Sequence, residues 1–211
     1  ALEIQDVTKF FRNSGFTIFA NSIEKGSVVR AIPGPNCGSR SVADRMNSWA
    51  QEEGAPGMGY IIFSENTAKG PIANALGIEK ALEFKTLFKL NDGDALFFSC
   101  ASESDAANLA GKARVKIATD RGLIEKNTFK FCWIVDYPMF EKDENTGKIE
   151  FSHNPFSMPQ GGMEALMTEN PLDILAYQYD LVCNGIELSS GAIRNHVPEI
   201  MYKAFEIAGH K

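Results

Sequence analysis

The chain has 211 residues, of which 44% are hydrophobic and 23% are charged, as is usual for a soluble globular protein of one large or two small domains. Its net charge of −6 excludes a protein that binds nucleic acid through bulk positive charge alone. No segment has the roughly 18 consecutive apolar residues of a membrane helix, and the N-terminus does not resemble a signal peptide. The cysteines have no zinc-ligand spacing and are expected to be buried, reduced thiols of a cytoplasmic protein: Cys37, Cys100, Cys132 and Cys183.

The first half of the chain alternates short apolar segments with helical patterns. Strands are predicted at residues 16–20, 28–32, 59–63 and 95–100. One helix is expected to be capped by Ser41, another to cover residues 78–88, and a third to open at Ser104 and Asp105. The alternation is irregular and there is no glycine-rich phosphate loop, so the pattern favours an α+β domain over a dinucleotide-binding sheet.

The second half begins near residue 120 and has longer polar turns. An apolar strand is predicted at residues 129–135, followed by a polar turn at 141–147 and a hairpin partner at 148–153. A short helix is expected at residues 161–167, and a last helix begins at Pro198.

The strongest local signal is the pair Asn184-Gly185 between two apolar runs, which is typical of a two-residue β-hairpin. This turn predicts that Cys183 pairs with Ile186, Val182 with Glu187 and Asp180 with Ser189. Since side chains alternate between faces, one face would carry Asp180, Val182, Glu187 and Ser189. The other would be apolar and belong in a core, with Leu181, Cys183, Ile186 and Leu188.

Two carboxylates therefore lie diagonally on the first face, about 7–8 Å apart. Asp180 and Glu187 at that spacing are able to flank a divalent ion such as Mg²⁺ with waters between them. The alternative is the solvated outer face of an amphipathic hairpin, because surface carboxylates are common.

Two further side chains are candidates for the same site. Strict alternation places Arg194 on the face opposite Glu187, but a bulge within residues 189–191 would bring it to the carboxylate face, where it would suit a substrate carboxylate. Otherwise it is a surface arginine. His153 follows a predicted strand, where site residues are frequent, although a lone histidine is more often structural.

Four segments resemble, in order and spacing, motifs of bacterial-type aspartyl-tRNA synthetases. They are residues 132–140 (CWIVDYPMF), 152–159 (SHNPFSMP), 176–188 (AYQYDLVCNGIEL) and 189–196 (SSGAIRNH). Residues 11–119 resemble the GAD domain inserted in these enzymes, which also occurs in an archaeal tRNA-dependent amidotransferase subunit. The resemblance covers essentially the whole chain.

The resemblance implies an α+β fold: a GAD-like domain with a mixed or antiparallel sheet flanked by helices, and part of a class II antiparallel sheet. Residues 1–10 would be an edge or connection of the catalytic domain, 11–119 the GAD domain, and 120–211 a partial catalytic domain. In the parent enzyme, Asp180 and Glu187 would hold Mg²⁺, with Glu187 also at the ATP phosphates. His153 and Arg194 would bind aspartate.

For the parent, the resemblance implies ATP, Mg²⁺, aspartate and tRNA as ligands, a homodimer, and a cytoplasmic location without a membrane. This sequence departs from the common pattern at Asn154, where a second histidine is usual, and at Ser189 and Ser190, where glycines are usual. An asparagine does not titrate near neutral pH, so a proton role at residue 154 is not expected.

The three class II signature motifs and the anticodon-binding barrel have no match within the 211 residues. Without the arginines of motifs 2 and 3, ATP loses its main positive contacts, so the fragment alone is expected to be inactive and to bind no cofactor. Two other interpretations stay open: a stand-alone tRNA- or protein-binding module, and a structural spacer. The salt dependence of tRNA binding would separate these two.

Overall fold

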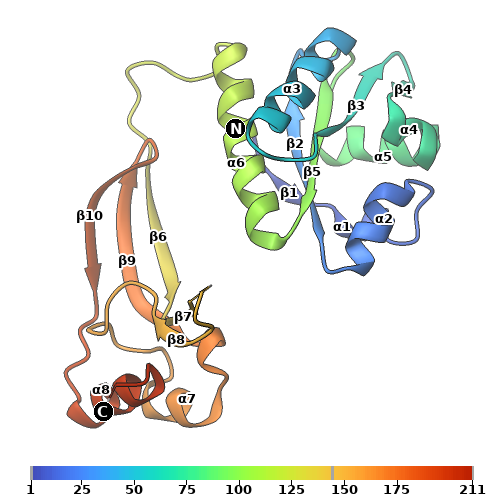
Figure 1. Ribbon diagram of the computed structural model, residues 1–211. Coiled ribbons are helices and arrows are strands. Elements are labelled where there is room, and N and C mark those ends of the chain that lie inside the picture. Colours follow the sequence, from blue (N-terminus) through green and yellow to red (C-terminus); the bar gives the residue numbers. More distant parts are fainter. Residues whose placement is uncertain (1, 144, 211) are drawn as a thin grey trace. The chain divides into compact units, whose positions relative to one another are not determined.

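The computed structural model describes residues 2–143 and 145–210, which form two compact units (Figure 1). One unit ends at Glu125 and the other begins at Lys126. Each unit has its own hydrophobic core. None of the helices formed by the described residues has the length and apolarity needed to cross a bilayer.

The first unit is built on an antiparallel sheet. Its strands lie in the order β1 (Gln5–Asp6), β2 (Val28–Gly34), β5 (Ala95–Ala101), β3 (Gly59–Ser64) and β4 (Thr67–Lys69). The helices that flank it are α1 (Thr8–Phe11), α2 (Thr17–Glu24), α3 (Arg40–Glu52), α4 (Pro71–Leu76), α5 (Ile78–Leu87) and α6 (Glu103–Asp120). The predicted α+β class with antiparallel sheets is confirmed.

Strand β5 shows how the helices divide between the two faces of this sheet. Its Leu96 and Phe98 enter a core that α1, α2, α4 and α5 complete. Its Ala95 and Phe97 point the other way, into a core shared with α3 and α6. Because alternate residues face opposite sides, a strand that is buried on both faces must be apolar throughout, which explains this run.

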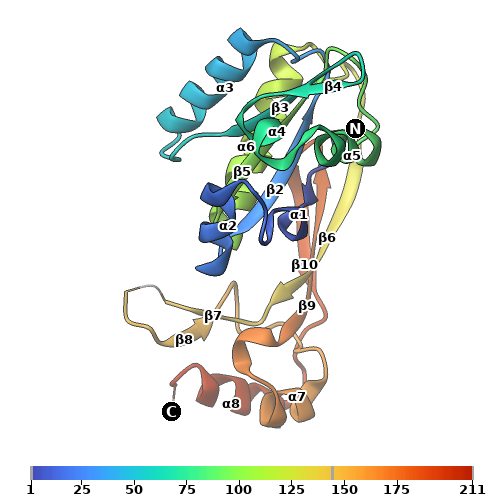
Figure 2. The same ribbon diagram turned by 90° about the vertical axis from the view of Figure 1, so that its right-hand side faces the viewer.

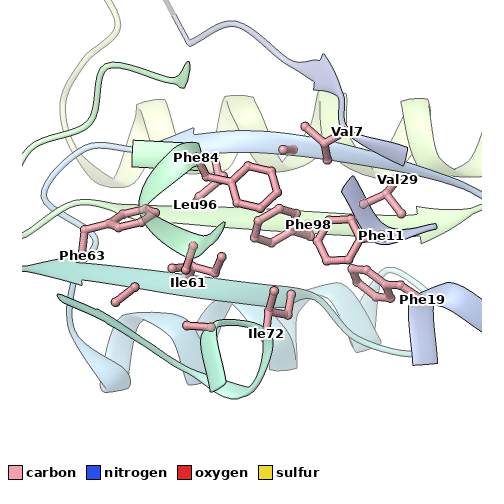
Figure 3. Packing of buried hydrophobic residues seen from close by; sticks show 14 of the residues in the cluster. Val7, Phe11, Phe19, Val29, Ile61, Phe63, Ile72, Phe84, Leu96 and Phe98 are labelled. Atoms are coloured by element: carbon pink, nitrogen blue, oxygen red, sulfur yellow. The ribbon is translucent and has the colours of Figure 1, made fainter. Parts of the chain in front are cut away.

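Phenylalanine rings dominate the first of these cores (Figure 3). The ring of Phe11 is fully buried, and its centroid lies 5.1 Å from that of Phe19, 5.9 Å from Phe84 and 5.5 Å from Phe98. Most of these pairs meet edge to face, the geometry that the aromatic quadrupole favours. The cluster joins α1, α2, α5 and β5 into one packed layer.

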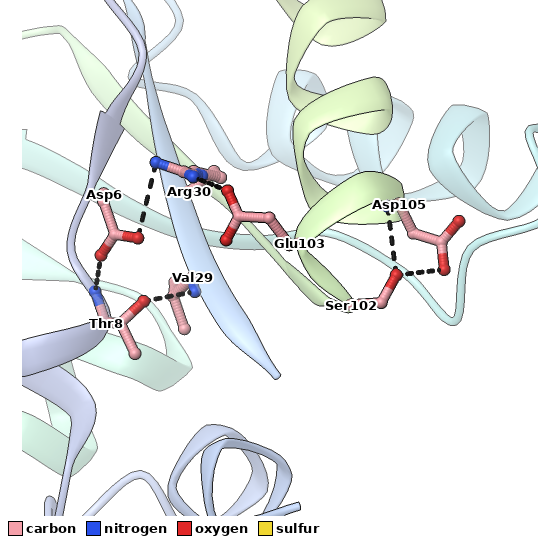
Figure 4. A network of polar contacts seen from close by, with 7 residues as sticks. All are labelled: Asp6, Thr8, Val29, Arg30, Ser102, Glu103 and Asp105. Atoms are coloured by element: carbon pink, nitrogen blue, oxygen red, sulfur yellow. Dashed lines mark hydrogen bonds and ion pairs between the residues drawn. The ribbon is translucent and has the colours of Figure 1, made fainter. Parts of the chain in front are cut away.

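A polar network fixes the N-terminal strand to the edge of the sheet (Figure 4). Arg30 on β2 forms ion pairs with Asp6, at 3.4 Å, and with Glu103 at the start of α6. The other carboxylate oxygen of Asp6 accepts the backbone N–H of Thr8 at 2.9 Å. The Thr8 hydroxyl accepts the backbone N–H of Val29, also at 2.9 Å. These contacts satisfy backbone donors that a two-residue edge strand leaves without partners.

Two expectations for this unit are corrected by the structure. Residues 16–20 are not a strand, because helix α2 begins at Thr17. Phe19 and Ile23, four residues apart, both enter the core, so the apolar run has helical periodicity. Neither predicted helix cap is correct.

The serines that cap helices α3 and α6 each lie two positions before the predicted ones. Ser39 caps α3 and Ser102 caps α6, each accepting a backbone N–H from the first turn. Each segment offers two serines two residues apart, and only backbone geometry decides which one is the cap.

The second unit contains a three-stranded antiparallel sheet with the order β10 (Ile186–Ala192), β9 (Leu175–Cys183) and β6 (Phe131–Pro138). Figure 2 gives a second view of the same strands. A short hairpin, β7 (Phe140–Lys142) and β8 (Ile149–Phe151), and the helices α7 (Gly162–Thr168), η1 (Pro171–Asp173) and α8 (Pro198–Ile207) complete the unit. Its core is built around one end of the sheet, from Met139, Phe140, Ala165, Leu166, Ile174, Ala176 and Ala204.

The predicted hairpin partner of the first strand in this unit is wrong. Strand β8 pairs with β7, whereas β6 pairs with β9, more than thirty residues further along the chain. Pro138 lacks the N–H that a continuing ladder needs, and after it the chain turns so that Met139 and Phe140 become buried. All four cysteines are free, but Cys132 is exposed and Cys100 is half-buried, contrary to the expectation that each would be buried.

Candidate functional site

The hairpin between β9 and β10 turns at Asn184 and Gly185, as predicted. Both residues have positive φ, 52° and 83°, which is the conformation of a type I′ turn and the reason for the Asn-Gly sequence. The Asn184 side chain donates to the carbonyl of Thr128 at 2.9 Å and accepts the backbone N–H of Lys130 at 3.0 Å. The turn is therefore fixed to the segment that leads into β6.

The first two predicted pairs of the hairpin are confirmed: Ile186 lies opposite Cys183, and Glu187 opposite Val182. The next pair is wrong, because the register shifts between Glu187 and Ser189. Leu188 is the extra residue of this bulge, so Asp180 lies opposite Ser190 instead of Ser189.

This bulge also decides the side on which Arg194 lies. Ala192 is opposite Gln178, on the same face as Asp180. Arg194 follows two residues later, in a bridge with Ser157, so alternation brings it to the carboxylate face. The sequence left two alternatives for Arg194, and a bulge that brings it to the carboxylate face was one of them. That bulge was expected within residues 189–191, and it lies at Leu188. Within the described residues the guanidinium forms no ion pair, and its carbon lies 5.2 Å from the centroid of the Phe156 ring.

The opposite face of this sheet was predicted to belong in a core, and that prediction is wrong. Ile186 is 67% exposed and Leu188 is 57% exposed, although Cys183 is buried. On β6, Trp133 is also exposed, with its ring against that of Tyr179. The reason is that the core of this unit packs around one end of the sheet and leaves the end near the turn uncovered.

The carboxylate face carries a hydrogen bond that links two strands. The hydroxyl of Tyr137, from the end of β6, donates to Oδ2 of Asp180 on β9. This hydrogen bond, with desolvation and the negative charges of Asp180 and Glu187, raises the pKa of Tyr137 to about 12. Glu187 lies opposite Val182, and Val182 shares a face with Asp180, so the two predicted metal ligands lie on one face of the sheet.

His153 meets the same tyrosine from the loop after β8. The two rings have centroids 4.8 Å apart and an interplanar angle of 86°, an edge-to-face contact. His153 is exposed. Its neighbour Asn154 donates from Nδ2 to Oε1 of Gln178 at 3.5 Å and accepts from the hydroxyl of buried Ser157 at 3.2 Å. The loop is thus joined to β9 by side chains.

The structure therefore places the predicted residues in two adjacent groups. Tyr137 contacts both Asp180 and His153, and Glu187 lies on the same sheet face as Asp180. Arg194 lies beside the loop, where its guanidinium packs on Phe156.

The carboxylates of this face are few for a metal site made of protein ligands alone. In the part of the chain that the structure describes, no group of three or more His, Cys, Asp and Glu side chains is placed to hold a metal ion. Mg²⁺ is usually held by one or two carboxylates, with substrate phosphates and waters supplying the remaining oxygens. Asp180 keeps Oδ1 free of hydrogen bonds to the described residues, and Glu187 is exposed, so this pair fits an ion that arrives with a nucleotide.

Sequence reasoning missed Tyr137 and Gln178 as part of this face. Gln178 could have been found, because it precedes Asp180 by two residues on one strand and alternation puts both on the same side. Tyr137 could not, because strict alternation along β6 places it with Trp133 and Val135 on the opposite face. Its true side depends on a register shift between Val135 and Tyr137.

A sequence model of the family described as tRNA synthetases class II (D, K and N) matches residues 6–211. The chain belongs to this family. The matched range includes Tyr137, His153, Asp180, Glu187 and Arg194, so the whole carboxylate face lies within it.

Individual synthetases of the same family are similar over nearly the whole chain. An aspartate–tRNA(Asp/Asn) ligase of Zymomonas mobilis is 59% identical over 211 residues, 99% of this chain and 35% of the relative. The ligases with the same name from Gluconobacter oxydans and Rickettsia bellii are 55% and 57% identical, over 99% and 98% of this chain and 35% and 36% of their own lengths. The chain therefore spans about a third of the length of these relatives.

Proposed function

We propose that this chain is part of an ATP-dependent aspartate–tRNA ligase, and that the second unit supplies one face of the site where aspartate is activated. The observation that carries the proposal is that Tyr137 contacts both Asp180 and His153, with Glu187 on the same sheet face as Asp180, within the range that matches the synthetase family. A fold alone is compatible with many activities, whereas this set of side chains is specific to the proposed one.

In this proposal, Asp180 and Glu187 hold Mg²⁺, and Glu187 also faces the phosphates of ATP. The ion, when bound, would neutralise phosphate charge as the nucleotide reacts. Arg194 pairs with a carboxylate of aspartate, for which its planar guanidinium is suited, and His153 lines the amino-acid pocket. These groups would orient the aspartate carboxylate for attack on the α-phosphate of ATP, which releases pyrophosphate and gives aspartyl adenylate. A hydroxyl of the terminal ribose of tRNA then takes the aspartyl group, and AMP leaves.

We further propose that the full-length protein acts on both aspartate and asparagine tRNA. The similar ligases are aspartate–tRNA(Asp/Asn) ligases by name, which supports this dual specificity. Aminoacylation of the two purified tRNAs by the full-length protein, with aspartate as the amino acid, tests it directly. Charging of aspartate tRNA alone would reject the dual specificity and leave the ligase activity in place.

The remaining assignments rest on the sequence motifs. Residues 1–10 form an edge or connection of the catalytic domain, 11–119 the inserted GAD domain and 120–211 part of the catalytic domain. The parent is a cytoplasmic homodimer. For residues 11–119, the alternative of a separate tRNA- or protein-binding module has no observation in its favour over a role within the ligase.

The decisive assay for the activity is aspartate-dependent exchange of pyrophosphate into ATP. The full-length protein is expected to catalyse exchange, and residues 1–211 alone are expected not to, because the motif 2 and motif 3 arginines of the family have no match among them. Exchange by the 211 residues alone would mean that the ATP contacts lie within them. No exchange by the full-length protein would reject the proposed activity.

A further inference from the structure

Tyr137 occupies the centre of the candidate site only because the backbone of β6 is redirected just before it. Up to Val135, which lies opposite Tyr179, the strand alternates regularly and its odd-numbered side chains lie on the exposed apolar face. The register then shifts, and Tyr137 lies opposite Ala176 in place of Tyr177. Since Ala176, Gln178 and Asp180 share a face, the shift moves Tyr137 to the side of the carboxylates.

The residue at this shift has an unfavourable backbone conformation. Asp136 has φ of 59°, in the left-handed region that residues with a Cβ seldom adopt. Its carboxylate accepts a hydrogen bond from Nε2 of Gln160 at 2.7 Å, and the same amide group lies 3.4 Å from the carbonyl of Ala176. Strained residues and register shifts concentrate where a side chain must be re-aimed at a functional site.

The redirected side chain makes two contacts of different chemistry. Its hydroxyl donates to Oδ2 of Asp180, which leaves Oδ1 for another partner. The edge-to-face contact of its ring with His153, at a centroid distance of 4.8 Å, limits the orientations open to the imidazole. Tyr137 therefore touches both Asp180, which is assigned to the metal, and His153, which is assigned to the amino acid.

We propose that Tyr137 is a positioning residue that holds the Asp180 carboxylate through its hydroxyl and the His153 imidazole through its ring. The inference rests on the proposed aspartate–tRNA ligase function and deepens it. Its two contacts are separable by substitution: Tyr137→Phe removes only the hydroxyl, whereas Tyr137→Leu removes the ring as well. Tyr202→Phe is the matched control, since Tyr202 is 76% exposed on α8 and loses the same atom.

The test uses the full-length protein and reads binding as well as catalysis. Calorimetry measures ATP binding as Mg²⁺ is varied, and pyrophosphate exchange gives the KM for aspartate. Loss of a hydrogen bond to a charged group predicts that Tyr137→Phe raises the Mg²⁺ concentration for half-maximal ATP binding by about tenfold. The KM for aspartate in this variant should change by less than about twofold, because the ring still holds His153. Tyr137→Leu should raise both.

Each outcome decides the question. The inference is supported if Tyr137→Phe raises the Mg²⁺ concentration for half-maximal ATP binding about tenfold and leaves the KM for aspartate unchanged, while Tyr137→Leu raises both. The inference is overturned if Tyr137→Phe changes the Mg²⁺ requirement and the KM for aspartate equally, or if neither Tyr137 variant differs from Tyr202→Phe. If the melting temperature shows that Tyr137→Leu does not fold, Tyr137→Phe alone still tests the inference, because its Mg²⁺ requirement should rise while its KM for aspartate should not. Absence of exchange by the unsubstituted protein would reject the proposed function instead.

Discussion

Replacing Phe98 with alanine should strongly destabilise the first unit. Phe98 is fully buried, and its ring centroid lies 5.5 Å from those of Phe11 and Phe84, in edge-to-face contacts at 78° and 75°. Truncating a buried phenylalanine to alanine costs about 3–5 kcal/mol, because apolar burial is lost and a cavity remains. Phe98→Leu keeps most of the volume and loses mainly the two ring pairs, for which about 1–3 kcal/mol is expected.

Urea unfolding of the 211-residue chain measures this loss. The chain has two tryptophans, Trp49 in the first unit and Trp133 in the second, so a Trp133→Phe background leaves Trp49 as a probe of the first unit alone. Ile18→Ala is the control: Ile18 is 67% exposed, and its loss should change the unfolding free energy by no more than about 0.5 kcal/mol. A Phe98→Ala effect below about 1 kcal/mol would refute the packing described for this core.

Three other results are expected. Cys132 should react with iodoacetamide well before Cys37, because Cys132 is exposed and burial raises the pKa of the Cys37 thiol, which lowers its thiolate fraction at a given pH; equal rates would contradict this. Gly185→Ala should destabilise the second unit by roughly 1 kcal/mol, seen by Trp133 fluorescence, since φ of 83° is strained for alanine; a stabilised variant would contradict the turn. In the full-length protein, Arg194→Lys should raise the KM for aspartate by about tenfold or more, because lysine has no bidentate fork, and an unchanged KM would remove Arg194 from the aspartate site.

The parts of the fold that the sequence predicted well are those fixed by local chemistry. The Asn184-Gly185 turn was correct because a type I′ turn demands positive φ at both residues, and this requirement is visible in two letters. The strand that contains residues 95–98 was predicted correctly, because a strand buried on both faces must be apolar at every position. By contrast, residues 16–20 suit a strand or a helix equally by composition, and only packing against Phe11 decides for the helix.

The candidate site was predicted less completely because two register shifts determine it. The shift after Glu187 brings Arg194 to the carboxylate face, and the shift before Tyr137 brings the phenol there. The first is a bulge within a hairpin, and the second depends on pairing between two strands that are far apart in the sequence. Residue alternation encodes neither. The exposed apolar face was missed for a related reason: alternation predicts which residues share a face, but it does not predict what covers that face.

The most direct test of the proposed ligase site is the effect of Glu187→Gln on aspartate-dependent pyrophosphate exchange by the full-length protein. Glu150→Gln is the matched control, since it removes the same charge from an exposed strand residue in the same unit. Loss of a ligand to a metal that contributes several kcal/mol predicts a fall in exchange of about a hundredfold for Glu187→Gln and little change for Glu150→Gln. Equal activity in the two variants would contradict the assignment of this sheet face as the site where aspartate is activated.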